Sequence, residues 1–432
     1  MSENQSKGNV FAIATMFALF FMIAFVTNFA SPMGVIAKNQ FQASNALSQL
    51  GNAANFIAYL FMGIPGGLIL KRKGYKFTAL AAIAVGFAGV GVQLISGYVS
   101  SFAVYVLGAF IAGFSMCMLN LVVNPMLNTL GGGGNKGNQL VQFGCSLNSV
   151  GATLSPAVLG WLIGEITKDT AFIKAAPALM IAMGIFALAF VIVAFSKIPE
   201  PHMETAEEKA ARLSGQSSVM KDIAATLKFR HFTLGALAIF FYIVIEVGVP
   251  SMGMLYMTDC VKDAAGEITS KGPGYVGGAV AGVVCGAYWF LMMCGRLLGG
   301  VVGGKISSRV QVSFLASLGI ALLFAVMFVP VKMITLFGYQ FPLSMAFMVA
   351  VGLCTSVMWG GIFNMAAEGL GKYVPMGSGI FMCMVFGGIL IPVQGLIADK
   401  IGILSSYWLS IGLLAYVLFY ALIGSRVAKA QQ

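Results

Sequence analysis

A single carboxylic acid lies well inside an apolar run of this 432-residue sequence. It is Glu246, within FFYIVIEVGVPSMG, whereas the other acidic residues occupy polar segments or the ends of apolar runs. A charge at the centre of a bilayer costs at least about 2.5–3.5 kcal/mol, so a carboxyl kept there normally has a partner or a task. Glu246 is therefore predicted to accept hydrogen bonds from a solute, to carry a proton or to help bind Na⁺. The alternative is a protonated acid that ties two helices together.

The residues around Glu246 also fit a binding position. Tyr242 precedes it by four residues and so shares its face of a helix. Gly248 and Pro250 follow it, and both loosen the helix and free backbone carbonyls, as at ligand sites built on interrupted membrane helices.

Uncharged polar side chains in the other apolar runs supply the rest of a candidate cavity. Amides both donate and accept hydrogen bonds, and beside aromatic faces they suit a neutral, polyhydroxylated ligand. The alternative for each amide is an interhelical hydrogen bond, worth about 0.6 kcal/mol on average. Asn148 points roughly 120° away from Gln142 on an ideal helix, so the two are not expected to face one solute. The predicted solute-binding residues are Asn28, Asn52, Asn120, Asn124, Gln142, Asn148, Tyr242, Glu246, Trp359 and Asn364.

The remaining reactive side chains are assigned structural roles. Arg296 lies about two turns from the end of its apolar run, where it is expected to snorkel or to pair with a helix C-terminus. The histidines, His202 and His231, lie in the polar central segment, which excludes a buried histidine relay. None of the seven cysteines forms a CxxC pair, so neither a zinc site nor a disulfide framework is predicted. With one isolated glutamate in the apolar runs, an enzyme is not expected, and neither is a cofactor beyond a coupling H⁺ or Na⁺.

The composition indicates that most of this chain is embedded in lipid. The sequence is 59% hydrophobic and 9% charged, with a mean hydropathy of +0.91, whereas soluble chains carry roughly 25% charged residues. The net charge of +11 does not indicate nucleic-acid binding, because the basic residues lie in short loops between apolar runs. The lipid bilayer is therefore a predicted partner, and nucleic acid is not.

Twelve apolar runs have the length of about 20 residues that a membrane-spanning helix needs. The predicted fold is all-α and integral to the membrane, with twelve transmembrane helices in two pseudo-symmetric six-helix bundles. The expected domains are an N-terminal bundle (1–196), an interdomain linker (197–232) and a C-terminal bundle (233–432). Two short linker helices are expected, one over Glu204–Leu213 and one that Ser217 and Ser218 cap before Val219. The predicted spans are 9–31, 46–70, 77–97, 101–129, 139–164, 172–196, 233–257, 274–302, 311–330, 341–366, 376–398 and 404–424.

Basic residues orient these spans. With the N-terminus in the cytoplasm, cytoplasmic segments hold 17 of the 25 Lys and Arg residues and outer segments hold 7, Arg296 being within a span. The positive-inside rule therefore places both termini in the cytoplasm. A multi-pass protein of the cell membrane is predicted, in the bacterial inner membrane, as a monomer.

The two halves of the sequence repeat each other weakly. VNPMLNTLGG and FNMAAEGLGK align Asn124 with Asn364 at an offset of 240 residues. GGLILKRKGYK and GGKISSRV end corresponding spans. Transporters built from two parallel repeats bind their substrate at the interface between the repeats.

These motifs resemble the major facilitator superfamily and, within it, the fucose–galactose–glucose symporter family, including its L-fucose permease. The resemblance rests on IPGGLILKRKGYK, NPMLNTLG, LNSVGA, FYIVIEVG, CGRLLGG and the long segment IFNMAAEGLGKYVPMGSGIFMCMVFGGILIPVQGLIAD. It implies two six-helix bundles around a central cavity, alternating access and cation-coupled uptake of a monosaccharide, a hexose or deoxyhexose. It also implies that Asn148 and Glu246 face the sugar.

Three positions depart from that family pattern. The fucose permease has an acidic residue where this chain has Ser31, a glutamate where it has Asn120, and a glutamine where it has Cys145. Glu246 would then carry coupling alone, or Na⁺ drives transport, or the protein is an uncoupled sugar facilitator. A carrier for a nucleoside, an amino sugar or a drug is a further alternative, whereas a channel is disfavoured because no filter-like segment is present.

Overall fold

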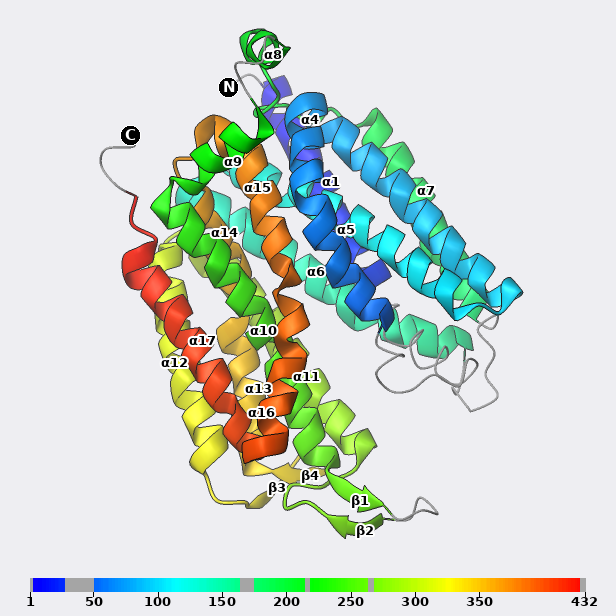
Figure 1. Cartoon of the computed structure of the whole chain (residues 1–432), viewed down its shortest axis with the longest axis vertical. Coiled ribbons are helices and arrows are strands. Elements are labelled where there is room, and N and C mark those ends of the chain that lie inside the picture. The colour runs from blue at the N-terminus through cyan, green and yellow to red at the C-terminus, as the bar shows by residue number, and fades with distance from the viewer. Residues whose placement is uncertain (1–2, 28–49, 164–174, 214–217, 263–267, 428–432) are drawn as a thin grey trace.

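The computed structural model describes residues 3–27, 50–163, 175–213, 218–262 and 268–427, and almost all of them are helical (Figure 1). The first bundle consists of α1 (Glu3–Thr27), α4 (Leu50–Val99), α5 (Phe102–Leu130), α6 (Gly134–Ile163) and α7 (Ala176–Phe195). The linker holds α8 (Ala206–Leu213) and α9 (Val219–Leu227). The second bundle consists of α10 (Arg230–Thr258), α11 (Gly278–Gly303), α12 (Ser308–Phe328), α13 (Leu343–Thr355), α14 (Met358–Ala367), η2 (Gly371–Tyr373), α15 (Val374–Cys383), η3 (Met384–Leu390), α16 (Ile391–Ile401), η4 (Leu404–Ser406), α17 (Tyr407–Phe419) and η5 (Tyr420–Gly424).

The twelve predicted spans are confirmed, although several of them are joined or broken. Among the described residues, nine helices are long and apolar enough to cross a bilayer, and one of these, Ala53–Val99, contains two predicted spans. Helices α1 and α6 account for the remaining two. The tenth span is divided into α13 and α14, and the eleventh into α15, η3 and α16. The first of these breaks matters for the site, because it turns backbone carbonyls toward neighbouring helices.

The two bundles lie side by side and diverge along their length (Figure 1). We call the end where α1 begins and η5 ends the terminal end, and the opposite end the distal end. Each bundle has its own apolar core, centred on α5 with α1 and α7 in the first and on α10 with α13 and α17 in the second. The ribbons of the bundles approach each other at the terminal end and separate toward the distal end.

Glycine backbones let α4 and α15 cross in direct contact near the terminal end. A Cβ at Gly379 would lie 2.7 Å from the Gly63 carbonyl oxygen, and a Cβ at Gly67 would lie 2.6 Å from the Pro375 carbonyl oxygen. Any larger residue would push the helices apart, because real Cβ atoms do not approach backbone atoms so closely. This crossing therefore depends on residues without side chains.

Side-chain hydrogen bonds join the bundles in the same region. The Asn128 amide of α5 donates to Asn364 Oδ1 of α14 (2.6 Å), and Asn364 donates in turn to Ser308 Oγ (2.9 Å). Gln142 Nε2 of α6 donates to the Val357 carbonyl oxygen (2.9 Å), which also accepts the Gly361 N–H at the start of α14 (2.9 Å). The repeat position Asn364 thus serves as a contact between bundles.

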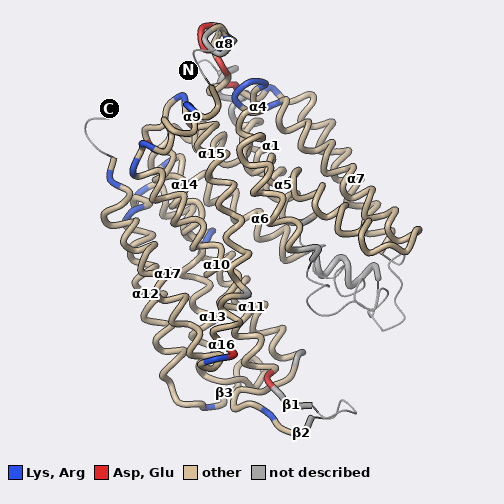
Figure 2. Tube along the Cα trace, viewed as in Figure 1, with Lys and Arg blue, Asp and Glu red and all other residues tan. Residues whose placement is uncertain are grey.

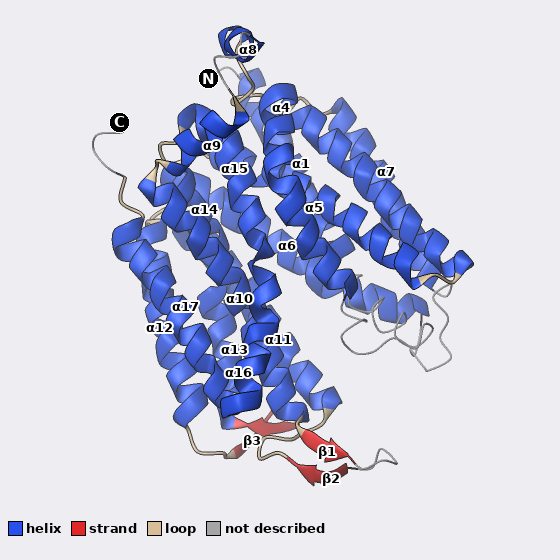
Figure 3. Ribbon diagram, viewed as in Figure 1, coloured by secondary structure: helices blue, strands red, loops and turns tan. Residues whose placement is uncertain are grey.

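Charged residues are concentrated at the terminal end, around the bend of α4, the linker helices and the end of η5 (Figure 2). The distal end of the second bundle instead carries two short hairpins (Figure 3), formed by β1 (Cys260–Lys262) with β2 (Ile268–Lys271) and by β3 (Met333–Leu336) with β4 (Tyr339–Pro342). This asymmetry agrees with the loop charges read from the sequence.

The linker is hydrogen-bonded to the bend of α4. Both predicted linker helices are present, and Ser218 caps α9 by accepting the Lys221 backbone N–H (3.3 Å). Gly74 forms the bend with a φ of 84°, a conformation that glycine adopts readily. The Glu200 carboxylate accepts the backbone N–H groups of Tyr75 and Lys76 that this bend exposes.

His202 makes the contact between the linker and the bend of α4 sensitive to pH. Its Nδ1 lies 2.7 Å from the Tyr75 hydroxyl, and burial lowers the pKa of the imidazole below its usual 6.5. The unfolded chain therefore binds a proton more readily than the folded one, so stability is full above pH 6.5 and falls as the pH drops through that value. We expect the melting temperature of the detergent-solubilised protein to fall between roughly pH 8 and pH 5.5, and to fall less for His202→Gln. Equal pH dependence of the two proteins would contradict this assignment.

Candidate functional site

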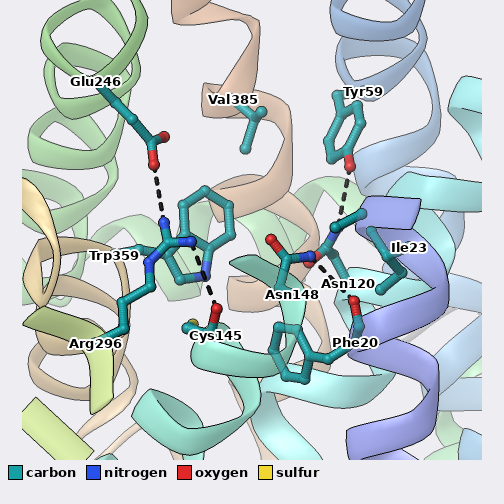
Figure 4. A pocket seen from close by; sticks show the side chains of 11 residues that line it. Phe20, Ile23, Tyr59, Asn120, Cys145, Asn148, Glu246, Arg296, Trp359 and Val385 are labelled. Carbon is teal, nitrogen blue, oxygen red and sulfur yellow. Dashed lines mark hydrogen bonds and ion pairs between the residues drawn. The ribbon is translucent and has the colours of Figure 1, made fainter. Parts of the chain in front are cut away.

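A cavity of about 180 Å³ lies between the two bundles (Figure 4). Eight elements line it, four from each bundle: α1, α4, α5 and α6 face α10, α11, α14 and η3. Its lining residues are Phe20, Ile23, Ala24, Tyr59, Asn120, Cys145, Asn148, Glu246, Arg296, Trp359 and Val385. A solute held there would touch both bundles, so a relative movement of the bundles would change its surroundings.

Glu246 faces this cavity as one half of an ion pair. Its Oε1 accepts hydrogen bonds from Arg296 Nη2 (2.9 Å) and from the Tyr242 hydroxyl (2.8 Å). The Arg296 and Glu246 side chains are 10% and 13% exposed, so the pair is shielded from solvent but not sealed off. Among the described residues, no side chain or backbone group donates to Glu246 Oε2. That oxygen is available to a ligand in the cavity.

Arg296 does not snorkel toward the end of its span, whereas the expected pairing with a helix C-terminus is present, at the Ser356 carbonyl that ends α13. Its guanidinium points into the cavity and connects the bundles, because Nη1 donates to Ser149 Oγ of α6 (2.6 Å) while Nη2 binds Glu246 of α10. Its Nε also donates to the Ser356 carbonyl at the end of α13 (3.4 Å). Two opposite charges offset each other here, so the cavity keeps strong hydrogen-bonding groups with little net charge.

Amides and a phenol form the opposite side of the cavity. Asn120 Nδ2 donates to the Tyr59 hydroxyl (3.0 Å) and to the Met116 carbonyl (3.0 Å). Asn124 lies one turn further on and is fully buried, where it accepts the Trp359 indole N–H (3.1 Å). Asn124 therefore orients Trp359, whose ring lines the cavity, and does not line it itself.

Asn148 connects this cavity with a second one. It donates to the Phe20 carbonyl of α1 (3.1 Å) and, with Glu246 and Arg296, also lines an adjoining cavity of about 450 Å³. The other residues of the second cavity are Ser149, Ala152, Thr153, Gly286 and Trp289, which follow α6 and α11 toward the distal end. Together the two cavities extend from the ion pair toward the distal end.

The predicted site residues fall into three groups. Asn120, Asn148, Glu246 and Trp359 line the cavity, and Tyr242 supports Glu246 from behind. Asn124, Gln142 and Asn364 do not line this cavity, and each makes a hydrogen bond between helices. The separation of Gln142 from Asn148 that helix geometry predicted is confirmed. Asn28 and Ser31 lie outside the described residues, as does the side chain of Asn52.

Several lining residues were missed by sequence reasoning. Arg296, like Glu246, is a charged residue within an apolar run. Because it lies only about two turns from the end of that run, a structural role was favoured for it. Cys145 and the α1 residues Phe20, Ile23 and Ala24 are apolar and indistinguishable from core residues by type or spacing.

The sequence matches the Major Facilitator Superfamily over residues 14–391. It is 28% identical over 429 residues to the glucose/galactose transporter of Brucella abortus biovar 1 (strain 9-941), with 98% of this chain and 97% of that protein covered. It is 22% identical over 424 residues to the L-fucose-proton symporter of Escherichia coli (strain K12), with 92% and 89% covered. A crystal structure of the E. coli fucose:proton symporter superposes with a TM-score of 0.81 at 17% identity, over 97% of this chain and 100% of that chain. The arrangement of helices is thus shared with a solved structure.

Proposed function

The chain belongs to the Major Facilitator Superfamily, and we propose that it is a secondary active transporter that moves a monosaccharide by alternating access. The substrate would be a hexose or deoxyhexose, carried by cation-coupled symport. The observation that carries this proposal is the cavity between the bundles, with the charge-balanced Glu246–Arg296 pair and Trp359 of the second bundle on one side and Asn120 and Asn148 of the first bundle on the other. The names of the relatives, a glucose/galactose transporter and an L-fucose-proton symporter, support the same substrate class.

The chemistry of the lining suits a neutral sugar. Each hydroxyl group both donates and accepts, and the cavity offers the amides of Asn120 and Asn148 as well as the free Oε2 of Glu246. Trp359 supplies an aromatic face beside them. A charged solute would find its charge unbalanced, since Glu246 and Arg296 already neutralise each other. An apolar solute would leave these polar groups unpaired, which costs free energy.

Glu246 is the proposed coupling group. It lies in the cavity that would hold the sugar, and protonation would remove the charge that binds Arg296. Because Arg296 also holds Ser149 of the first bundle, binding of a cation at Glu246 would alter a contact between bundles. The coupling ion would be H⁺ or Na⁺.

The access path supports uptake from outside. The second cavity leads toward the distal end, whereas the glycine crossing and the Asn128–Asn364 bond hold the bundles together at the terminal end. We propose that the basic terminal end lies in the cytoplasm of a bacterium, with the protein in the inner membrane as a monomer. The described conformation would then be open to the outside.

Uptake into proteoliposomes tests this proposal. We expect labelled D-glucose, D-galactose or L-fucose to accumulate when an inward H⁺ or Na⁺ gradient is imposed, with each gradient applied separately. Ionophores that collapse the effective gradient should abolish accumulation but leave equilibration and exchange. Accumulation of a nucleoside without any monosaccharide would contradict the substrate class, and equilibration without accumulation under either gradient would contradict symport.

A further inference from the structure

A separate, apolar pocket lies on the outer side of the second bundle, away from the two cavities described above. It has a volume of about 260 Å³ and opens between α11, α12 and the junction of α13 with α14. Its lining residues are Gly295, Leu298, Gly299, Val302, Ile306, Val310, Gln311, Phe314, Leu315, Leu353, Ser356 and Val357. Among these, glutamine and serine provide the polar side chains.

The mouth of the pocket belongs to the surface that faces lipid. Leu298, Val302, Val310 and Phe314 are exposed apolar residues on spanning helices, so hydrocarbon is the medium they contact. The floor is formed where Gly295 and Gly299 of α11 lie directly against Ser356 and Val357. A groove that begins in the lipid and is lined by aliphatic groups matches the shape and polarity of an acyl chain.

A basic residue borders the pocket in the sequence at its terminal end. Lys305 is exposed and immediately precedes Ile306, which lines the pocket. The adjacent N-terminus of α12 has its first turn capped by Ser307, which accepts the Val310 N–H (3.4 Å). The start of a helix carries a partial positive charge and unpaired N–H groups, which favour an anion. An anionic headgroup at this rim would place its acyl chain at the mouth of the groove.

We propose that this pocket binds one acyl chain of an anionic phospholipid from the leaflet at the terminal end, with the headgroup phosphate at Lys305 and the start of α12. The transported sugar is not the occupant, because its hydroxyl groups would find almost no partners there. This inference rests on the pocket alone and does not depend on the proposed substrate.

The bound chain would act on the solute cavity through the α13–α14 junction. Ser356 and Val357 line the pocket, and their carbonyl oxygens accept hydrogen bonds from residues that do not line it. The Ser356 carbonyl accepts from Arg296 Nε (3.4 Å), and the Val357 carbonyl accepts from Gln142 Nε2 of the first bundle (2.9 Å). Filling the pocket would therefore support the position of Arg296 and the closed contact between the bundles.

A pair of tryptophan variants tests the groove. Val302 is 36% exposed and lines the pocket, whereas its neighbour Val301 is 63% exposed on the same helix and does not line it. We expect native mass spectrometry of the full-length protein, titrated with dioleoylphosphatidylglycerol, to show weaker lipid binding by Val302→Trp than by the parent. Val301→Trp should bind as the parent does. Leu298→Trp fills the same groove and serves as a second variant if Val302→Trp melts at a lower temperature.

Removal of the rim charge tests the headgroup. Lys305→Gln should lower the preference for phosphatidylglycerol over phosphatidylcholine by about fivefold, the effect of one basic residue near an anionic lipid. Lys136→Gln, an exposed change at the same end but on the first bundle, should leave the preference unchanged. Equal phosphatidylglycerol binding by Val302→Trp, Leu298→Trp and Val301→Trp would overturn the acyl-chain site. An unchanged lipid preference in Lys305→Gln would overturn the anionic headgroup. Neither experiment measures uptake, so a failure of the lipid-site proposal can be distinguished from a failure of the transport proposal.

Discussion

Uphill accumulation of solute is expected to disappear in Glu246→Gln, with the internal concentration rising only to the external one. The substitution removes the charge that Arg296 Nη2 binds at 2.9 Å and the proposed cation-binding group. Breaking a buried ion pair by removing one partner costs about 3–5 kcal/mol, because the other charge remains unpaired. The Arg296 and Glu246 side chains are 10% and 13% exposed, and this partial exposure places the cost toward the lower end of that range. The measurement is uptake by proteoliposomes under an imposed gradient, compared with counterflow, which needs no coupling.

The double variant Glu246→Gln/Arg296→Gln separates stability from coupling. Each single variant leaves one charge unpaired and should lower the melting temperature. The double variant removes both charges and should recover most of the stability, without recovering accumulation. Tyr242→Phe provides a matched control, because it removes one hydrogen bond to Glu246 Oε1 and keeps both charges. If the double variant concentrates solute as well as the parent does, Glu246 is not the coupling group.

This ion pair also marks the limit of prediction from the sequence. Glu246 was identified as a candidate site residue because a charge in lipid is energetically costly, and the same cost applies to Arg296. Their pairing joins residues 50 positions apart on different helices, and hydropathy says nothing about how α10 and α11 are rotated against each other. Arg296 was therefore expected to snorkel or to pair with a helix C-terminus, and its ion pair with Glu246 was not predicted.

The fold was predictable for a simpler reason. In lipid every backbone polar group must be satisfied within the span, so long apolar runs become helices irrespective of their detailed sequence. The breaks within the tenth and eleventh spans were not predictable in this way. They occur beside tertiary contacts, such as the Gln142 amide that donates a second hydrogen bond to the Val357 carbonyl and the Phe240 backbone that approaches Gly387.

The amides show the same division between local and tertiary information. Helix geometry correctly separated Gln142 from Asn148, because both lie on one helix. It could not decide which of Asn120 and Asn124 lines the cavity, since they lie one turn apart on the same face. The Trp359 indole, from the other bundle, binds Asn124 and so leaves Asn120 as the lining residue.

The second large effect is expected at the glycine crossing between α4 and α15. The variant Gly379→Val should shift the protein toward the conformation that is open at the terminal end. The new side chain would collide with the Gly63 backbone, whose carbonyl oxygen lies 2.7 Å from the position of the Cβ. Overpacking of a close contact costs typically about 1–3 kcal/mol. That cost applies only while the bundles are closed at this end, so it changes the ratio of the two conformations by a factor of roughly 5 to 150. Electron–electron distance measurements between spin labels at Lys73→Cys and Lys372→Cys, in a background without reactive cysteines, report this separation.

Gly395→Val is the matched control, because Gly395 belongs to the same predicted span and no atom of the described residues lies within 4 Å of its Cβ position. We expect its distance distribution and its transport to match those of the parent. Gly379→Val should show the longer distance in most molecules and should lose most of its uptake, since a transporter held away from one of its two conformations cannot complete a cycle. The backbone contact is needed only in the closed state, so a substitution there acts on the equilibrium without touching the solute cavity. A short distance in Gly379→Val, together with parental uptake, would show that α4 and α15 can separate locally without moving the bundles.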